Sequence, residues 1–278
     1  MKYVHTIFDG RNQAGLGSII QAQLILNAYA NKKQKLIFFP GFINLYHWQF
    51  ENLSKEKYCE NLNFFVSKKT SQKKSTTSVF ISDIFLVKYW AEFKLEEIID
   101  YNRNKYQEYL PKNKEDKLIV AIHYRTHLKT EIGLVDKNSD RFSSLNFYEN
   151  AIQYCLERHK EILQFNLYCL NKDQTTLYLS KKYNVIIKDD TSLRTTFSDL
   201  RSANILIASK SSLSWSAHLY GLNQYVISQP FWHPWSKSTI LLNERGKKIR
   251  HNLNLKTLKR KIKSFKYYFF KTKRTDIF

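Results

Sequence analysis

Apolar positions along the chain follow two alternating patterns. Short apolar runs are typical of buried strands, and apolar residues that recur every three or four positions are typical of helices. Near the start, residues 3–8 and 35–39 form two short runs, and a Pro-Gly pair follows the second. Between them, after a turn with two glycines, Ile20, Leu24 and Ala28 share one helical face. This opening predicts a strand, a turn, a helix and a strand, which together form a βαβ unit.

The same alternation returns in the second half of the chain. It predicts strands at residues 118–122, 165–170, 184–187, 204–208 and 225–228, the last of the chain, and helices at residues 147–158, 173–182, 196–203 and 213–220. Such alternation is typical of a parallel sheet with helices on both faces, so we expect an α/β fold. Residues 82–109 have mostly helical spacing, and the polar stretches at 68–78 and 129–144 predict exposed loops.

Polar groups follow directly after the strand expected at residues 118–122. His123 and Arg125 are two positions apart, so in an extended chain their side chains point to the same face. In open α/β sheets, ligands bind beyond the carboxyl ends of the strands. The guanidinium of Arg125 offers a planar fork of donors suited to a diphosphate, and His123 can add another donor. The alternative is that the strand simply runs into a basic surface loop.

The composition allows a large core and indicates a reducing compartment. The chain has 278 residues, of which 43% are hydrophobic, enough for one large domain or two smaller ones. No apolar run approaches the roughly 20 residues of a membrane-spanning helix, and the first ten residues lack the apolar core of a signal peptide. Cys59, Cys155 and Cys169 show no CxxC spacing. We therefore expect free thiols in the cytosol, without a disulfide framework or a zinc site.

Positive charge is concentrated at the C-terminal end. The formal net charge is +21, and residues 244–278 contain thirteen Lys or Arg against two acidic residues, a net charge of +11. Apolar residues recur at helical spacing among these bases, at positions 255, 258, 262, 265 and 269. This pattern predicts a basic amphipathic helix on an anionic membrane surface. Packing of the helix against the protein is the alternative, and nucleic acid is less favoured because no recognition module is evident.

Four segments share their order and spacing with one enzyme family. They are the glycine-rich turn at 15–21, His-Tyr-Arg at 123–125, the helix start at 146–152, and the stretch from Phe-Ser-Asp-Leu at 197–200 to Ser-Ser-Leu-Ser-Trp at 211–215. Together they resemble the bacterial α-1,2-fucosyltransferase family and, more loosely, the wider group of GDP-fucose-dependent enzymes. Gln-Pro-Phe-Trp at 229–232 fits as well, so the resemblance covers most of residues 10–235.

The chain departs from that family at several of these positions. Ser18 and Ile19 stand where the family usually has Asn and Gln, and Thr126 replaces a second Arg. The acidic residue that follows closely in the family has no counterpart nearer than Glu131, and Ser216 replaces a second Trp. These positions surround the expected substrate sites, so the departures bear on the sugar and on activity more than on the fold.

The resemblance implies an architecture and a function. The architecture is two Rossmann-like domains of the GT-B type facing a cleft, with residues 1–115 on the acceptor side, residues 116–242 binding the nucleotide sugar, and residues 243–278 forming the basic helical tail. The function is inverting transfer of a sugar, L-fucose from GDP-fucose, to a hydroxyl of a cell-surface glycan precursor, in the cytoplasm at the inner face of the membrane. The alternatives are another nucleotide-sugar donor, or a noncatalytic membrane- or polyanion-binding protein derived from a transferase.

The resemblance also implies a donor site. The diphosphate leaving group gains negative charge, and preorganised donors stabilise that charge in the transition state. Arg125 is the expected diphosphate ligand, with an ordinary ion pair as its alternative. Ser211 and Ser212 stand between a strand and a helix, where N–H groups and hydroxyls can seat a phosphate; plain helix capping is the alternative and is compatible with it. Gly15 and Gly17 would let the backbone approach the donor, or would form only a turn.

The remaining expected site residues are His123, Asp199 and a base. His123 would contact donor or acceptor, with a structural histidine as the alternative. Asp199 matches the family's acidic residue near the nucleotide, unless it is a carboxylate on a helix surface. A base must take the acceptor proton, and Glu131 and Asp136 lie in the appropriate loop. The sequence has no Asp-x-Asp metal seat and no clustered His ligands. The resemblance implies an enzyme that is independent of metal ions and needs no other cofactor.

Overall fold

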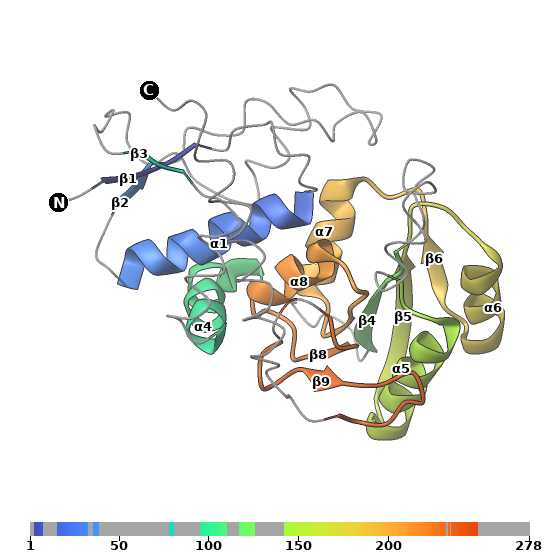
Figure 1. Ribbon diagram of the computed structural model, residues 1–278. Helices are drawn as coiled ribbons and strands as arrows, with labels where there is room; N and C mark the ends of the chain where they lie inside the picture. Colours follow the sequence, from blue (N-terminus) through green and yellow to red (C-terminus); the bar gives the residue numbers. More distant parts are fainter. Residues whose placement is uncertain are drawn as a thin grey trace, which may run out of the picture.

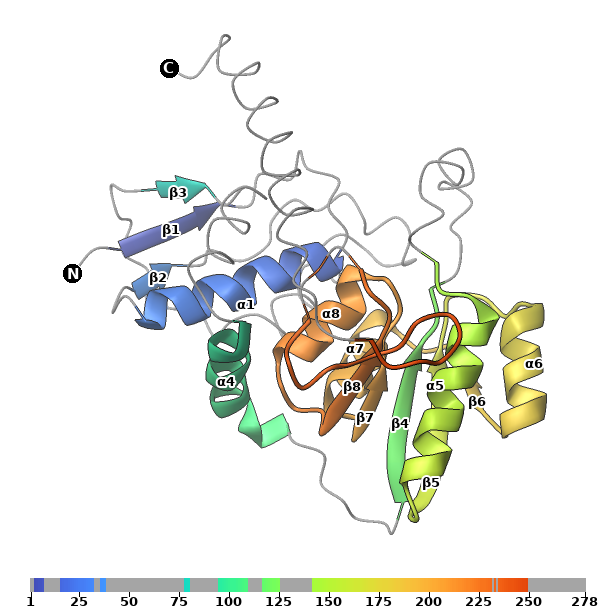
Figure 2. The same ribbon diagram turned by 60° about the horizontal axis from the view of Figure 1, so that its bottom comes forward.

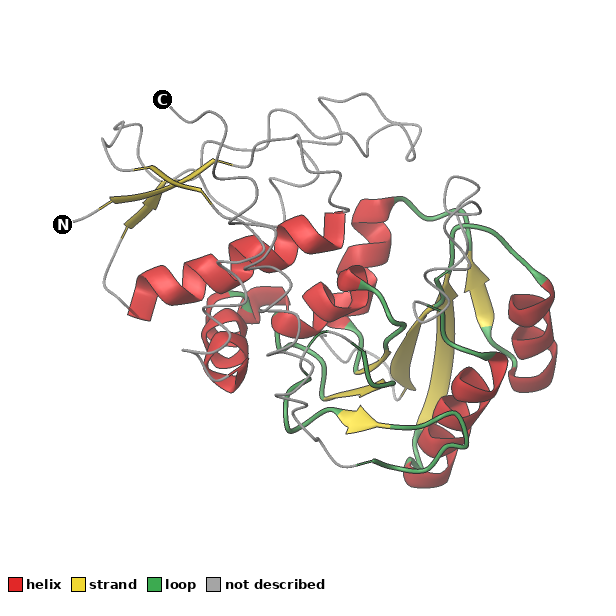
Figure 3. Cartoon of the chain, viewed as in Figure 1, coloured by secondary structure: helices red, strands yellow, loops and turns green. Residues whose placement is uncertain are grey.

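The computed structural model describes residues 3–7, 16–32, 36–38, 78–80, 95–109, 117–125, 142–231, 233 and 235–249 (Figure 1). The expected tail helix lies outside these residues, as does much of the expected domain 1–115. The described elements form two separate parallel sheets accompanied by helices (Figure 3). This arrangement confirms the predicted α/β class. The GT-B arrangement around a cleft and the domain boundaries stay predictions.

The larger sheet has six parallel strands: β4 (Lys117–His123), β5 (Ile162–Tyr168), β6 (Ile186–Lys188), β7 (Ile205–Ile207), β8 (Tyr225–Ser228) and β9 (Ile240–Leu241). Their order across the sheet is β6-β5-β4-β7-β8-β9. The chain therefore adds strands outward on one side of β4 and then returns to add strands on its other side. This is the doubly wound order, and its reversal between β4 and β7 is the switch point at which such sheets bind ligands.

Four helices cover the two faces of this sheet (Figure 2), with α5 (Leu145–Arg158) and α6 (Gln174–Tyr183) on one face and α7 (Leu193–Ser202) and α8 (Ser212–Leu219) on the other. The alternation of side chains along β4 fits this division. Val120 and Ile122 belong to the core on the α5 side, whereas Ala121 belongs to the core on the α8 side. The next residue on the α8 side is His123.

Local sequence sets where these helices begin. Each first turn has a capping side chain that accepts a backbone N–H, and the four capping residues are Ser144, Asp173, Ser192 and Ser211. At Asp173 the capping box is complete, because the Thr176 hydroxyl accepts the backbone N–H of Asp173. Asn184 then ends α6 in the left-handed conformation.

The N-terminal part contains the smaller parallel sheet, in which β1 (Tyr3–Ile7) lies between β2 (Leu36–Phe38) and β3 (Ser78–Phe80). The predicted strand–helix–strand opening is therefore found. The helix between the two strands is α1 (Leu16–Lys32). A further helix, α4 (Leu95–Lys105), precedes a short 3-10 turn at Gln107–Tyr109, and it confirms the part of the helix expected at 82–109 that the structure describes.

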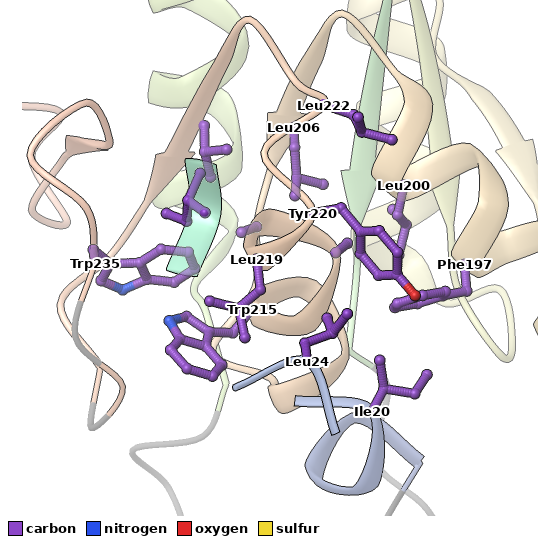
Figure 4. Close-up of a cluster of buried hydrophobic side chains, with 14 of the residues drawn as sticks. Ile20, Leu24, Phe197, Leu200, Leu206, Trp215, Leu219, Tyr220, Leu222 and Trp235 are labelled. Atoms are coloured by element: carbon purple, nitrogen blue, oxygen red, sulfur yellow. The ribbon is translucent and has the colours of Figure 1, made fainter. Parts of the chain in front are cut away.

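Helix α1 packs directly against α8. Ile20, Leu24 and Ala28 are buried, as their spacing predicted, and they share one apolar core with α4, α7 and α8. Figure 4 shows Leu24 on the side of Trp215 of α8, and Ile20 on the side of Phe197 of α7. An N-terminal helix thus covers the helix that leaves the switch point after β7.

Several sequence predictions were wrong in extent. The predicted loop at 68–78 ends in β3, which begins at Ser78. The strand expected at 184–187 is found at residues 186–188. The strand expected at 165–170 begins earlier, at Ile162, and the polar Gln164 interrupts the apolar run there. The strand at 225–228 is not the last, because β9 follows. A strand of two residues is too short to leave a periodic pattern.

Candidate functional site

The candidate site lies at the switch point, beyond the carboxyl ends of β4 and β7. From here the chain enters α5 on one face of the sheet and α8 on the other. The polar residues 123–125 begin with the last residue of β4, and the polar residues 209–212 come just after β7. Because β4 and β7 are neighbours, the two polar segments that the sequence analysis selected are brought together.

His123 joins these segments. Its Nδ1 atom lies 2.9 Å from the Oγ of Ser209 and in a short hydrogen bond with the Oγ of Ser214, and the two hydroxyls are 3.2 Å apart. The side chain is only 9% exposed. His123 therefore fixes the end of β4 to the loop and the first turn that follow β7.

Burial and the nearby charge of Arg125 lower the pKa of His123 to about 3. The imidazole is therefore neutral at neutral pH and contributes hydrogen bonds without positive charge. This geometry matches the structural histidine that was the alternative for this position, while contact with a donor or acceptor stays a prediction.

Arg125 lies two residues beyond the end of β4. It is partly buried, and its guanidinium carbon lies 5.8 Å from the ring centroid of Phe142, just before α5. Its charge is close enough to lower the pKa of His123. The structure therefore brings Arg125 and His123 together, while the role of Arg125 as a diphosphate ligand stays a prediction.

Ser211 and Ser212 form the start of α8. The Oγ of Ser211 accepts the N–H of Leu213 at 3.2 Å, so Ser211 caps the helix. The Oγ of Ser212 lies 3.1 Å from the Nε2 of His233, whose ring stacks on Trp215. Capping was the alternative for these serines, and a capped helix start can still attract an anion.

Gly17 lies against this helix start. A Cβ at Gly17 would come within 2.3 Å of the Leu213 nitrogen and 2.4 Å of the Ser212 carbonyl carbon. The hydroxyl of Ser216 is 2.6 Å from the carbonyl oxygen of Gly17 and 2.7 Å from that of Ser212. The close backbone approach expected at Gly17 is thus made to α8, while contact of Gly17 with a donor stays a prediction.

Asp199 reaches the same edge from α7. Its carboxylate accepts the phenolic O–H of Tyr168 at 2.9 Å. Tyr168 ends β5 directly opposite His123 in the parallel register, and burial together with Asp199 raises the Tyr168 pKa. Asp199 is therefore one strand away from His123, near the carboxyl ends of the central strands.

Several predicted site residues lie outside the described residues. Gly15, Glu131 and Asp136 are among them, and so is Thr126, which departs from the family pattern. The identity of the base therefore stays a prediction. In the described part of the chain, no group of three or more His, Cys, Asp and Glu side chains is placed to hold a metal ion. In the same part, no helix is long and apolar enough to cross a membrane.

The sequence showed no sign of the carboxylate of Glu244, which lies just beyond the end of β9. Glu244 accepts from the Nε2 of Gln229 at 2.5 Å and from the hydroxyl of Ser144, the cap of α5. Its carbonyl accepts from Asn150 at 3.2 Å. These partners are 15 to 100 positions away in sequence, so no local motif could indicate the cluster. His233 was missed for the same reason, because Ser212 lies 21 positions earlier.

Comparison with known proteins gives little further identification. No family model matches the chain, and no curated protein matches it. Among solved structures, Escherichia coli heptosyltransferase WaaC with ADP is similar with a TM-score of 0.44 and 10% identity. The same enzyme with ADP-2-deoxy-2-fluoro heptose has a TM-score of 0.42 and 10% identity, and in both cases 94% of this chain and 100% of the other are covered. Similarity this low carries no argument about activity.

Proposed function

We propose that this protein is an inverting glycosyltransferase that moves L-fucose from GDP-fucose to a hydroxyl of a cell-surface glycan precursor. The observation that carries the proposal is the meeting of three separate motif segments around the start of α8. Gly17 lies against the backbone of Ser212 and Leu213, and His123 bonds Ser209 and Ser214. All three segments belong to the resemblance to the fucosyltransferase family, and they are far apart in sequence.

The chemistry of the site suits a departing nucleoside diphosphate. Arg125 supplies a cation at the edge of the sheet, and the N-terminal end of α8 supplies a positive helix dipole beside the hydroxyl of Ser212. Donors held in place before the reaction stabilise growing charge without reorganisation. Arg125, Ser211 and Ser212 would bind the diphosphate, Gly17 would border it, and Asp199 would contact the nucleoside side.

The finer assignments rest on the resemblance. GDP and fucose follow from the family and not from a described base-binding contact. An inverting transfer also needs a base for the acceptor hydroxyl, and Glu131 is the first candidate, followed by Asp136. The site would neutralise the leaving group with protein cations, so the proposal includes no metal and no other cofactor. The basic tail would hold the enzyme at the inner face of an anionic membrane, where a lipid-linked acceptor lies.

Calorimetric titration with GDP, UDP and ADP, each with and without magnesium, tests the proposal. We expect GDP-selective binding that does not require magnesium and that is lost in Arg125→Ala. Arg158→Ala is the matched control. Arg158 is an exposed arginine at the C-terminal end of α5, whereas the candidate site lies at the side where α5 begins. Binding to none of the nucleotides would contradict the proposal and favour the noncatalytic alternative. Tight UDP or ADP binding would assign another donor.

A further inference from the structure

Tyr168 is a buried tyrosine at the carboxyl end of β5 that none of the motif segments contains. It lies directly opposite His123 in the parallel register, and its carbonyl accepts the N–H of Tyr124 at 2.9 Å. Residues opposite each other in neighbouring strands point to the same face of a sheet. The side chain of Tyr168 therefore lies on the side of α7 and α8, as that of His123 does, and it belongs to the core on that side.

The phenol of Tyr168 has partners on both the strand and the helix. Its oxygen lies 2.9 Å from Oδ2 of Asp199, on α7. Asn166, two positions earlier on the same face of β5, is a second hydrogen-bond partner of the phenol. The Oδ1 of Asn166 in turn accepts from the Nε2 of Gln164 at 3.2 Å. A row of polar side chains therefore runs along this face of β5 and ends at Asp199.

The chemistry of the two groups sets the direction of the bond between Tyr168 and Asp199. An ionised carboxylate can only accept hydrogen bonds, whereas a phenol has one hydrogen to donate. Burial and the charge of Asp199 both raise the pKa of Tyr168, so the phenol keeps this hydrogen at any ordinary pH. The hydrogen therefore lies between the two side chains, and Asp199 is the acceptor.

This bond orients Asp199 and leaves it able to bind a ligand. Asp199 is only partly buried, and its partner is a phenol ring fixed in the core. A phenol holds a carboxylate without cancelling its charge, which a lysine or an arginine would do. The bond uses one of the roughly four lone-pair sites of a carboxylate, so the group can accept further N–H or O–H donors.

We propose that Tyr168 is a positioning residue for the nucleoside end of the donor site: its phenolic hydrogen holds the carboxylate of Asp199 in the orientation that accepts hydrogen bonds from the nucleoside. Tyr168 does not itself touch the nucleotide. The proposal rests on the proposed function, in which Asp199 contacts the nucleoside side, and it adds a residue of β5 to that site.

Calorimetric titration with GDP and with inorganic diphosphate tests this role, because diphosphate occupies only the phosphate end of the site. Tyr168→Phe keeps the buried ring and removes the phenolic hydrogen. We expect it to weaken GDP binding about three- to tenfold and to leave diphosphate binding unchanged. In an Asp199→Ala background, Tyr168→Phe should cause no further loss of GDP affinity, because the group through which Tyr168 acts is already absent.

Tyr178→Phe is the matched control. Tyr178 also donates its phenolic hydrogen to a carboxylate, that of Glu149 at 3.1 Å, but it lies on the outer helix α6. Its loss removes the same kind of bond away from the candidate site, so it should leave both affinities unchanged.

The outcomes separate the two proposals. Wild-type GDP affinity in Tyr168→Phe, equal losses of GDP and diphosphate affinity, or losses that add in the double variant would overturn the role of Tyr168 while leaving the proposed function intact. Failure of the wild-type protein to bind GDP would overturn both. If Tyr168→Phe does not fold, carbon NMR of the wild-type protein with ring-labelled tyrosine decides. GDP should shift the Cζ signal of Tyr168 and diphosphate should not, and a signal that GDP leaves unchanged would contradict the proposal.

Discussion

At Gly17, α1 lies directly against the backbone of the start of α8. Two effects oppose each other in Gly17→Ala. Alanine favours a helix interior over glycine by about 1 kcal/mol, whereas forcing a methyl group into packed backbone costs about 1–3 kcal/mol. Because the new Cβ would meet backbone atoms of Ser212 and Leu213, which cannot rotate away, we expect net destabilisation. Urea unfolding of the variant measures it.

The matched control is Asn31→Ala, at an exposed position of the same helix. It gains helix propensity without a new contact, so it should leave the free energy of unfolding unchanged or slightly raised. If Gly17→Ala raised the free energy of unfolding as much as Asn31→Ala does, α1 would not lie as close to α8 as described.

The neutral state of His123 has a consequence for acid stability. Its pKa is about 3 in the folded protein and about 6.5 when exposed, so the unfolded chain binds more protons between these values. The stability that comes from burying the neutral ring is complete above pH 6.5 and is lost as the pH falls. One such proton lowers the free energy of unfolding by about 1.4 kcal/mol per pH unit.

The variant His123→Gln removes this titration while keeping an amide near Ser209 and Ser214. Between pH 6 and pH 4, we expect the slope of unfolding free energy against pH to be about 1.4 kcal/mol per unit shallower than in the wild type. His218 retains its own slope, because burial also lowers its pKa to about 3. An unchanged slope in the variant would show that His123 titrates normally.

At the scale of elements, α1 is part of the core of the larger sheet and not only of the N-terminal part. Leu24 is fully buried between α1 and α8. Leu24→Ala should therefore lower the stability of the whole described core by about 2–5 kcal/mol. Chemical denaturation followed by tryptophan fluorescence measures this, because Trp215 lies in the same core (Figure 4).

Leu156→Ala, on the exposed side of α5, is the comparison and should cost much less. If Leu24→Ala altered helix content but left the fluorescence transition unchanged, α1 would unfold independently of the sheet.

The elements that were predicted well are those whose own residues show both an apolar pattern and a polar start. The strand at 118–122 and the helices at 147–158 and 173–182 each combine an apolar pattern with a polar start, and each is found within a few residues of its expected ends. β3 and β9 have three and two residues, so their pairing partners define them and their own sequence does not.

The candidate site was predictable only in part, for a similar reason. The polar strand end at 123–125 and the serines at 211–212 are local features that the sequence displays. That His123 bonds Ser209 and Ser214, and that Ser212 bonds His233, depends on the order of strands across the sheet. This strand order brings together residues up to 91 positions apart.

At the scale of the whole molecule, positive charge is divided between the body and the C-terminal segment. Residues 250–278 contain ten Lys or Arg and one acidic residue, which is +9 of the total of +21. Deletion of this segment should abolish binding to anionic lipid vesicles, since each basic residue near such a surface contributes about 1 kcal/mol. GDP affinity should be unchanged. Vesicle sedimentation and calorimetry on the same truncated protein check both statements.

Neutral vesicles provide the control, and binding of the intact protein to anionic vesicles should weaken as salt is added. If truncation removed vesicle binding and GDP binding together, the tail and the donor site would not be separate functions.

We propose that a nucleotide binds where Gly17, His123 and the start of α8 meet. Hydrogen–deuterium exchange of the intact protein with and without GDP tests this placement. We expect GDP to slow exchange in peptides covering residues 209–216 and 121–125, and to leave the outer helix at residues 174–183 unchanged. Slower exchange confined to other segments, or no change at saturating GDP, would contradict it.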